Sequence, residues 1–170
     1  YADQSEYVML AVDDGDQVWS MARDSQDLYG IGGDALVGAE VDDSGEFRLV
    51  VLDPSSGETQ ALDVLSRGRV ALDPTGDRAA AVTRVADVDE LVVLDRSTGD
   101  QQVHTLPQDR GVAYEHLELV GRWALISRSD IEHESALPPL LVDLDSPDAE
   151  PVVLDQLCGI ATFQLGSDPT

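Results

Sequence analysis

Short runs of valine, leucine and alanine alternate along this chain with turns made of aspartate, serine, proline and glycine. The clearest runs cover 49–53, 91–95 and 141–145, and a shorter one covers 10–13. Each run ends in an aspartate and is followed by a polar turn and a second strand-like run, which is typical of a β-hairpin. No window combines sustained helical spacing of apolar residues with helix caps. The pattern therefore predicts an all-β chain.

Two sets of turns recur along the chain with nearly the same period. The first set follows Asp13, Asp53, Asp95 and Asp145, which are 40, 42 and 50 residues apart. The second set contains Gly33, Gly76, Gly121 and Gly166, which are 43, 45 and 45 residues apart. Two alternating turns in one period of about 40–50 residues give four strands per repeat, which is the sequence signature of a β-propeller blade.

This period divides the chain into blades. We expect 1–23 to be the end of a blade, 24–66, 67–110 and 111–156 to be complete blades, and 157–170 to be the first strand of a further blade. The predicted fold class is an all-β partial propeller whose complete blades are four-stranded and antiparallel. Natural propellers contain about 4–8 blades. The remaining blades would come from a longer protein, or from another chain in a homo-oligomer or larger assembly, or the termini would close a small ring.

The repeat at 111–156 departs most from the common length. Its strands are expected at 115–120, 122–128, 139–145 and 151–155, with an irregular loop at 127–139. Because loops on a rigid scaffold often carry function, we predict that this loop contacts a partner. The residues proposed for the contact are Asp130, Ile131, Glu132, His133, Glu134 and Leu137.

The segments 71–78, Ala-Leu-Asp-Pro-Thr-Gly-Asp-Arg, and 91–100, which contains Asp95 and Gly99-Asp100, resemble a known repeat. They are similar to the WD40-like (PD40, TolB-type) propeller repeat, in which a strand enters a Ser-Pro-Asp-Gly-Lys turn and an outer hairpin carries Asp-x-x-Thr-Gly-Glu. The resemblance is closest at 67–110, whereas 111–156 lacks the proline turn. It implies a propeller fold but no particular activity, because propellers host many unrelated functions.

The charge of the chain narrows the choice of partners. The sequence has 34 acidic residues against 10 basic ones, and its net charge is −24. This balance argues against binding to nucleic acid and to anionic membrane surfaces, and no apolar run approaches the roughly 20 residues that span a bilayer. We expect a basic protein partner, or one reached through apolar contacts. The composition suits an exported protein and the cytoplasm of a halophile, and the TolB-type resemblance favours export.

Candidate chemistry is sparse. The acidic turns that contain Asp13, Asp14, Asp16, Asp42 and Asp43 could supply oxygen ligands to calcium, but neither turn matches the EF-hand loop, and tight hairpins select the same residues. We expect the repeated aspartates to accept backbone N–H groups across their own turns. Apart from calcium, no cofactor is expected. No Gly-x-Ser-x-Gly motif is present, and Cys158 is the single cysteine.

Three classes of function follow from these observations. The first is a non-enzymatic propeller module that binds a protein or carbohydrate partner through rim loops. The second is the propeller portion of a hydrolase or peptidase, with its catalytic residues mainly outside this chain. The third is a calcium- or ligand-binding sensor with its ligands in the aspartate-rich turns.

Overall fold

The computed structural model describes most of the chain from Glu6 to Asp155. The described residues are 6–10, 17–22, 26–32, 35–41, 47–53, 55–62 and 69–155, and side chains are described for 35–38, 48–53, 55–62 and 69–155. Every structural statement below concerns these residues. The predicted strand within 157–170 lies outside them. So do all five aspartates that were considered as calcium ligands.

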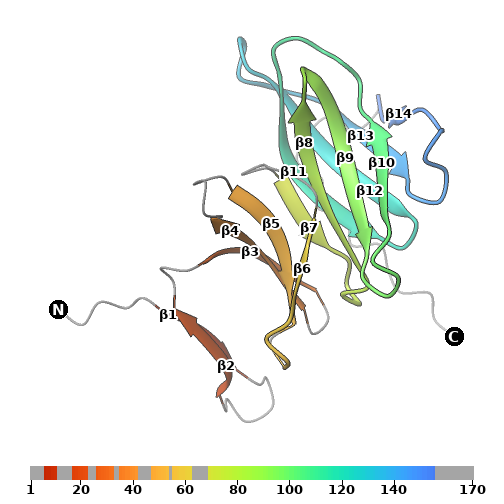
Figure 1. Cartoon of the computed structure of the whole chain (residues 1–170). Helices are drawn as coiled ribbons and strands as arrows, with labels where there is room; N and C mark the ends of the chain where they lie inside the picture. The colour runs from red at the N-terminus through yellow and green to blue at the C-terminus, as the bar shows by residue number, and fades with distance from the viewer. Residues whose placement is uncertain are drawn as a thin grey trace, which may run out of the picture.

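The described strands form antiparallel sheets in chain order (Figure 1). A two-stranded sheet contains β1 (Glu6–Leu10) and β2 (Gln17–Ala22). The first four-stranded sheet contains β3 (Gln26–Gly32), β4 (Ala35–Val41), β5 (Phe47–Leu52) and β6 (Thr59–Ala61). The second contains β7 (Arg69–Leu72), β8 (Arg78–Val85), β9 (Val88–Asp95) and β10 (Gln101–Thr105). The third contains β11 (Val112–Val120), β12 (Trp123–Asp130), β13 (Ser135–Asp143) and β14 (Val152–Val153).

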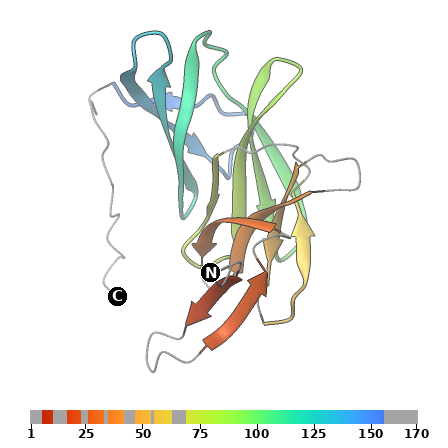
Figure 2. The ribbon, with the colours of Figure 1, turned by 90° about the vertical axis from the view of Figure 1, so that its left-hand side faces the viewer.

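The three four-stranded sheets, here called blades 1, 2 and 3, follow one another around the molecule (Figures 1 and 2). Strand β7 of blade 2 lies against β3 of blade 1 and β11 of blade 3, so the first strands of the blades meet on one side. Sheets that stack face to face with their first strands innermost are the arrangement of propeller blades. The predicted fold class is confirmed, whereas the divisions at 23, 66, 110 and 156 stay a prediction.

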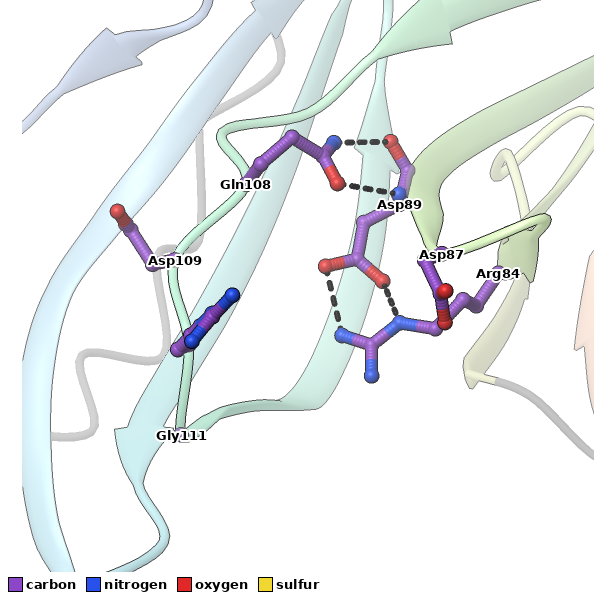
Figure 3. A pocket seen from close by; sticks show the side chains of 7 residues that line it. Arg84, Asp87, Asp89, Gln108, Asp109 and Gly111 are labelled. Atoms are coloured by element: carbon purple, nitrogen blue, oxygen red, sulfur yellow. Dashed lines mark hydrogen bonds and ion pairs between the residues drawn. The ribbon is translucent and has the colours of Figure 1, made fainter.

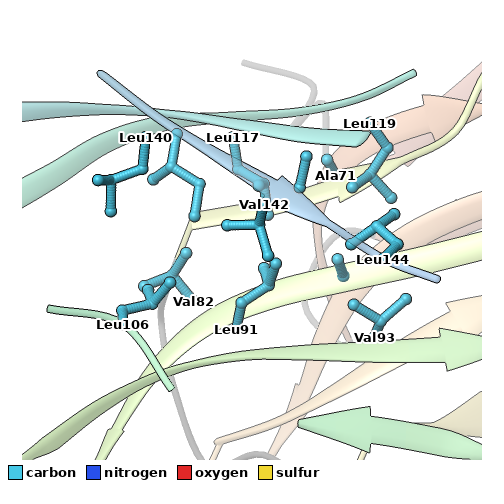
Figure 4. Packing of buried hydrophobic residues seen from close by; sticks show 13 residues of the cluster. Ala71, Val82, Leu91, Val93, Leu106, Leu117, Leu119, Leu140, Val142 and Leu144 are labelled. Carbon is cyan, nitrogen blue, oxygen red and sulfur yellow. The ribbon is translucent and has the colours of Figure 1, made fainter. Parts of the chain in front are cut away.

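Blade 2 has two apolar faces because side chains alternate across a strand. Leu91 and Val93 of β9 point toward blade 3, whereas Val92 and Leu94 point toward blade 1. Figure 4 shows the first of these interfaces, where Leu91 packs with Leu140 and Val142 of β13 and with other buried residues. Burial of both faces explains why β9 reads as a continuous apolar run rather than as alternating apolar and polar residues.

The second strand of blade 2 is built from small side chains. Ala79, Ala80 and Ala81 of β8 are all fully buried, with Ala80 in the interface with blade 3 and the other two in the interface with blade 1. On the neighbouring strand β9, which lies farther from β7, the corresponding positions are leucine and valine. The side chains between the blades therefore increase in size from β8 to β9.

The turns that end the third strands repeat almost atom for atom. In the β9–β10 turn, Oδ1 of Asp95 accepts the N–H of Ser97 at 2.9 Å and of Thr98 at 3.2 Å, and the N–H of Gly99 donates to the Asp95 carbonyl at 2.8 Å. Asp53 makes the same bonds to its own turn in blade 1. Gly99 has a φ of +78°, a conformation that costs glycine nothing. The expected role of these two aspartates is confirmed.

In blade 3 this role falls to a different aspartate from the one predicted. Oδ1 of Asp143 accepts the N–H of Asp145 at 3.1 Å, whereas Asp145 itself pairs with Arg78 of blade 2 at 3.4 Å. The turn after β13 carries two prolines and no glycine at the equivalent place, so its backbone follows another path. Asp145 was therefore assigned wrongly, and it ties blade 2 to blade 3.

The predicted irregular loop at 127–139 is wrong, because most of this segment is strand. Strand β12 continues to Asp130 and β13 begins at Ser135. Pro138 and Pro139 of this segment lie within β13 opposite a register shift between Ile126 and Arg128. A bulge is one of the few places where a sheet tolerates proline, since no ladder bond is lost there. The segment is a long hairpin with a four-residue turn.

His104 of β10 is a polar residue in an apolar place. It is 1% exposed, and neither ring nitrogen has a hydrogen-bond partner among the described residues. Burial lowers the pKa of His104 from its ordinary value of 6.5, and the charge of Asp143 partly opposes this shift. Burial therefore favours the neutral form of the ring in the folded protein.

Replacement of His104 by leucine should stabilise the protein. A buried polar group without a partner costs about 1–3 kcal/mol, so we expect His104→Leu to raise the free energy of unfolding by about 1–2 kcal/mol at pH 7. The pKa of His104 is lower in the folded protein than in the unfolded chain. As the pH falls below 6.5, the unfolded chain therefore takes up a proton first, and the free energy of unfolding decreases. The variant should therefore lose less stability than wild type between pH 7 and pH 5, as measured by urea unfolding.

His116 of β11 provides the control for this experiment, since its side chain is exposed. His116→Leu should change the free energy of unfolding by less than about 0.5 kcal/mol. A destabilised His104→Leu variant would contradict the assignment of an unpartnered ring.

The part of the chain that the structure describes contains no helix long and apolar enough to cross a bilayer.

Candidate functional site

A polar cleft of about 480 Å³ opens at the end of blade 2 where the β8–β9 turn meets the connection from β10 to β11 (Figure 3). Both lie at the rim of the molecule that is uppermost in Figure 1. The lining residues are Arg84, Asp87, Asp89, Gln108, Asp109, Arg110 and Gly111. None of these lining residues is a serine, cysteine or histidine, so the cleft offers charged groups for binding rather than a nucleophile with its base.

A bidentate ion pair forms one wall of the cleft. Arg84 near the end of β8 donates to Asp89 at the start of β9, through Nε at 2.5 Å and Nη2 at 2.8 Å. The two residues are opposite each other across a two-residue turn, which fixes their separation. The Asp89 side chain is only 5% exposed, whereas that of Arg84 is 56% exposed. The hydrogen bond from Arg84 to Asp89 raises the pKa of Arg84 above its ordinary value.

Gln108 fixes the backbone beneath this pair. Its Oε1 accepts the N–H of Asp89 at 3.1 Å, and its Nε2 donates to the carbonyls of Asp89 at 3.3 Å and Leu106 at 2.6 Å. Figure 3 shows Gln108 and the Arg84 guanidinium on either side of Asp89. The side-chain amide of Gln108 thereby attaches the connection between blades 2 and 3 to the backbone at the start of β9.

A second guanidinium, from Arg128 of β12, supports the other end of the connection. Arg128 is buried, and it donates to the Pro138 carbonyl through Nε at 3.0 Å and Nη2 at 2.8 Å. Its Nη1 pairs with Asp109 of the cleft at 3.2 Å. Nearby, the hydroxyl of Tyr114 donates to the Pro107 carbonyl at 3.1 Å, and burial raises the pKa of Tyr114 to about 12. Hydrogen bonds and an ion pair from Arg128 and Tyr114 therefore hold this part of the connection in place.

The turn above the cleft is strained. Ala86 and Asp87 have φ angles of +49° and +68°, in the left-handed region that residues with a Cβ seldom adopt. A two-residue hairpin turn of this kind normally contains asparagine and glycine. Strain of this type often marks a functional position. Here it holds Asp87 at the mouth of the cleft.

Relief of this strain should be measurable. We expect Ala86→Gly to raise the free energy of unfolding by about 1 kcal/mol, because glycine adopts the left-handed conformation without steric cost. Ala136 of β13 is exposed and has no positive φ, so Ala136→Gly should instead lower stability by about 0.5–1 kcal/mol. Urea midpoints of the two variants test the pair, and a loss of stability in both would mean that the turn is not strained.

Two charged residues of the cleft form no direct bond with the described residues, although the charge of Asp87 acts on Arg84 at longer range. Arg110 makes no hydrogen bond or ion pair there, and neither does Asp87. Arg110 belongs to the connection before β11, and Asp87 belongs to the β8–β9 turn. Both remain able to bind a ligand without breaking a bond within the protein.

The residues predicted to contact a partner lie on the same rim, in the β12–β13 hairpin. Oδ1 of Asp130 accepts the N–H of Glu132 at 2.8 Å and that of His133 at 3.2 Å, and its Oδ2 lies 2.8 Å from Nδ1 of His133. The hydrogen bond to His133 lowers the pKa of Asp130. Ile131 is 61% exposed at the tip. Glu134 ends the turn with a φ of +50°, and Leu137 lies on β13.

This hairpin contacts the cleft through the ion pair between Arg128 and Asp109 and through one backbone hydrogen bond. The N–H of Ile131 donates to the carbonyl of Gly111, a lining residue, at 2.7 Å. The structure thus brings the six predicted residues together in one hairpin beside the cleft. Their role in binding a partner stays a prediction.

Metal binding receives no support from the residues whose placement is known. Among them, no group of three or more histidine, cysteine, aspartate or glutamate side chains is arranged to hold a metal ion. Asp53 is typical of the acidic turns on the opposite rim, because hydrogen bonds from Ser55 lower its pKa to about 2. The Asp53 carboxylate already accepts hydrogen bonds from Ser55 and Ser56 of its own turn.

The cleft itself was not predicted from sequence. One signal was available for its ion pair, since Arg84 and Asp89 are equally distant from a turn at 86–87 and must face each other in a hairpin. No comparable signal indicates Gln108 or Arg128, whose partners lie on other strands.

Comparisons with known proteins support the fold. The chain is similar to the solved β-propeller domain of the Trilobed protease from Pyrococcus furiosus, with a TM-score of 0.53 and 18% sequence identity. The match covers 75% of this chain and 41% of that one. A structure of acylaminoacyl peptidase in complex with Z-Gly-Gly-Phe-chloromethyl ketone also matches, with a TM-score of 0.41, 12% identity, and coverage of 71% of this chain and 26% of that one.

No family model matches the sequence, and no curated protein matches it. The comparisons therefore do not bear out the WD40-like assignment in particular. This chain spans less than half the length of the solved propeller domain to which it is similar. Its fold is that of part of a β-propeller.

Proposed function

We propose that this chain is propeller sequence of a peptidase-type hydrolase and that it contributes a surface for peptides rather than the catalytic residues. The observation that carries the proposal is the rim cleft, where Arg110 and Asp87 form no hydrogen bond or ion pair with the described residues and the lining residues include no serine, cysteine or histidine. The similar solved propeller is a domain of the Trilobed protease. A propeller that accompanies a catalytic unit needs to bind substrate, not to cleave it.

The second candidate is a self-contained interaction module for a protein or carbohydrate. It is favoured by the tip of the β12–β13 hairpin, where Ile131 is 61% exposed on a turn held by Asp130. An apolar side chain on a fixed turn is a suitable contact for a partner.

A binding experiment separates the two candidates. The 170-residue protein would be titrated into fluorescein-labelled tetra-alanine and into fluorescein-labelled maltotetraose, with fluorescence anisotropy as the readout. The first proposal expects saturable binding of the peptide, and chromatography of the same mixture should show the peptide intact. Binding of the sugar alone would favour the second candidate. Absence of peptide binding would contradict the first.

A further inference from the structure

The cleft has more free hydrogen-bond donors than free acceptors. Arg84 uses Nε and Nη2 on Asp89, so its Nη1 remains available, and Arg110 uses none of its donors within the described chain. On the acceptor side, Asp89 uses both oxygens on Arg84 and Asp109 uses Oδ2 on Arg128, which leaves Oδ1 of Asp109 and the carboxylate of Asp87. The group that would best satisfy this cleft is therefore an anion with hydrogen-bond acceptors.

The charges around the cleft limit what that anion can be. Asp87, Asp89 and Asp109 line the same cleft, and the whole chain carries a net charge of −24. A doubly charged phosphate would be repelled more strongly by these carboxylates than a singly charged group. The planar fork of a guanidinium also matches a carboxylate, which it binds through two parallel N–H donors.

On the basis of the proposed function, we propose that this cleft is a binding site for a peptide carboxylate. Arg110 binds the carboxylate, Arg84 supplies a further donor through Nη1, and Asp87 accepts an N–H of the same peptide. The cleft volume of about 480 Å³ lies within the usual range for small-ligand sites, about 300–1,000 Å³. Because Gln108 and Arg128 hold the backbone of the connection that carries Arg110, the ordering required on binding is confined mainly to the Arg110 side chain.

The carboxylate could come from a peptide C-terminus or from an acidic side chain, and three labelled probes distinguish these sources. They are tetra-alanine with a free C-terminus, tetra-alanine amide, and the amide of Ala-Ala-Glu-Ala, each labelled with fluorescein at the N-terminus. Wild-type protein should bind the free acid about tenfold more tightly than the tetra-alanine amide, which is the size of effect expected of a charge-assisted pair on a hydrated rim. If the glutamate probe also binds tightly, the cleft accepts the carboxylate of an acidic side chain as well as that of a C-terminus.

Arg110→Gln is the test variant, and Arg48→Gln is its matched control. Both substitutions remove one exposed arginine that has no partner among the described residues, so they change the net charge equally, but Arg48 does not line the cleft. Arg110→Gln should bind the free acid and the amide with about equal affinity, whereas Arg48→Gln should keep a preference of about tenfold for the free acid.

The possible outcomes separate this inference from the proposed function. If wild type binds acid and amide equally, or if Arg110→Gln keeps the preference, the carboxylate site is wrong although peptide binding stands. If Arg48→Gln loses the preference too, long-range charge rather than the cleft is responsible, and the site is again wrong. If no peptide binds, the proposed function fails together with the inference.

Discussion

Leu91→Ala should lower the free energy of unfolding by about 3 kcal/mol, the largest loss that we expect from a single side chain. Leu91 is fully buried in the interface between blades 2 and 3, where it packs with Leu140 and Val142. Truncation of a leucine in such a place removes its transfer free energy and leaves a cavity, at a total cost of about 2–5 kcal/mol. Urea unfolding followed by far-UV circular dichroism would measure the change.

The control is Val103→Ala on the adjacent strand β10. Val103 is 49% exposed, so its truncation should change stability by less than about 0.5 kcal/mol. If Leu91→Ala were equally mild, the two blades would not share a packed interface. The slope of the transition should also be compared, because a partial propeller whose blades unfold separately would show a shallower slope rather than a shifted midpoint.

Arg84→Met should cost about 2–3 kcal/mol of stability. The substitution keeps most of the aliphatic stem but leaves the Asp89 carboxylate, with a side chain only 5% exposed, without its cation. Loss of one partner from a fully buried pair costs about 3–5 kcal/mol, and the expected value here is lower because Arg84 is itself 56% exposed to solvent. Urea midpoints again provide the measurement.

Arg69→Met is the matched comparison for this ion pair. Arg69 of blade 2 pairs with Glu115 of blade 3 at 3.2 Å, where both side chains are 48% exposed, and its Nε also donates to the Tyr114 carbonyl at 2.7 Å. An exposed pair of this kind contributes about 0–1 kcal/mol. Equal losses in the two variants would mean that burial of Asp89 does not decide the energy, and the rigid wall assigned to the cleft would have to be abandoned.

The sequence was informative wherever structure depends on local chemistry. Asp95 and Gly99 specify their turn through bonds that reach no farther than five residues, so the same pattern at Asp53 gives the same turn. The recurrence of such turns was sufficient to predict four strands per repeat. The fold class follows from these local rules and from apolar runs that are buried on both faces.

Prediction from sequence failed where the structure depends on contacts between residues that are far apart in the chain. The segment 127–139 was predicted to be a loop, but the Pro138 carbonyl accepts hydrogen bonds from Arg128, ten residues earlier on another strand. Strand β13 accommodates Pro138 and Pro139 at a bulge. The cleft is a similar case. Gln108 acts on Asp89 from nineteen residues away, and nothing in the sequence around either residue indicates the contact.

The buried alanines of β8 have a consequence for the geometry of the complete propeller. The buried side chains increase in size from β8 to β9, so this part of blade 2 fills more space between its neighbours at β9 than at β8 and widens outward as a wedge does. The wedge angle sets how many blades fill a full turn. Larger residues at Ala79, Ala80 or Ala81 would flatten the wedge and favour a wider circle with more blades. The inclination between neighbouring blades thus depends on a gradient of side-chain volume, and the three alanine methyl groups form its small end.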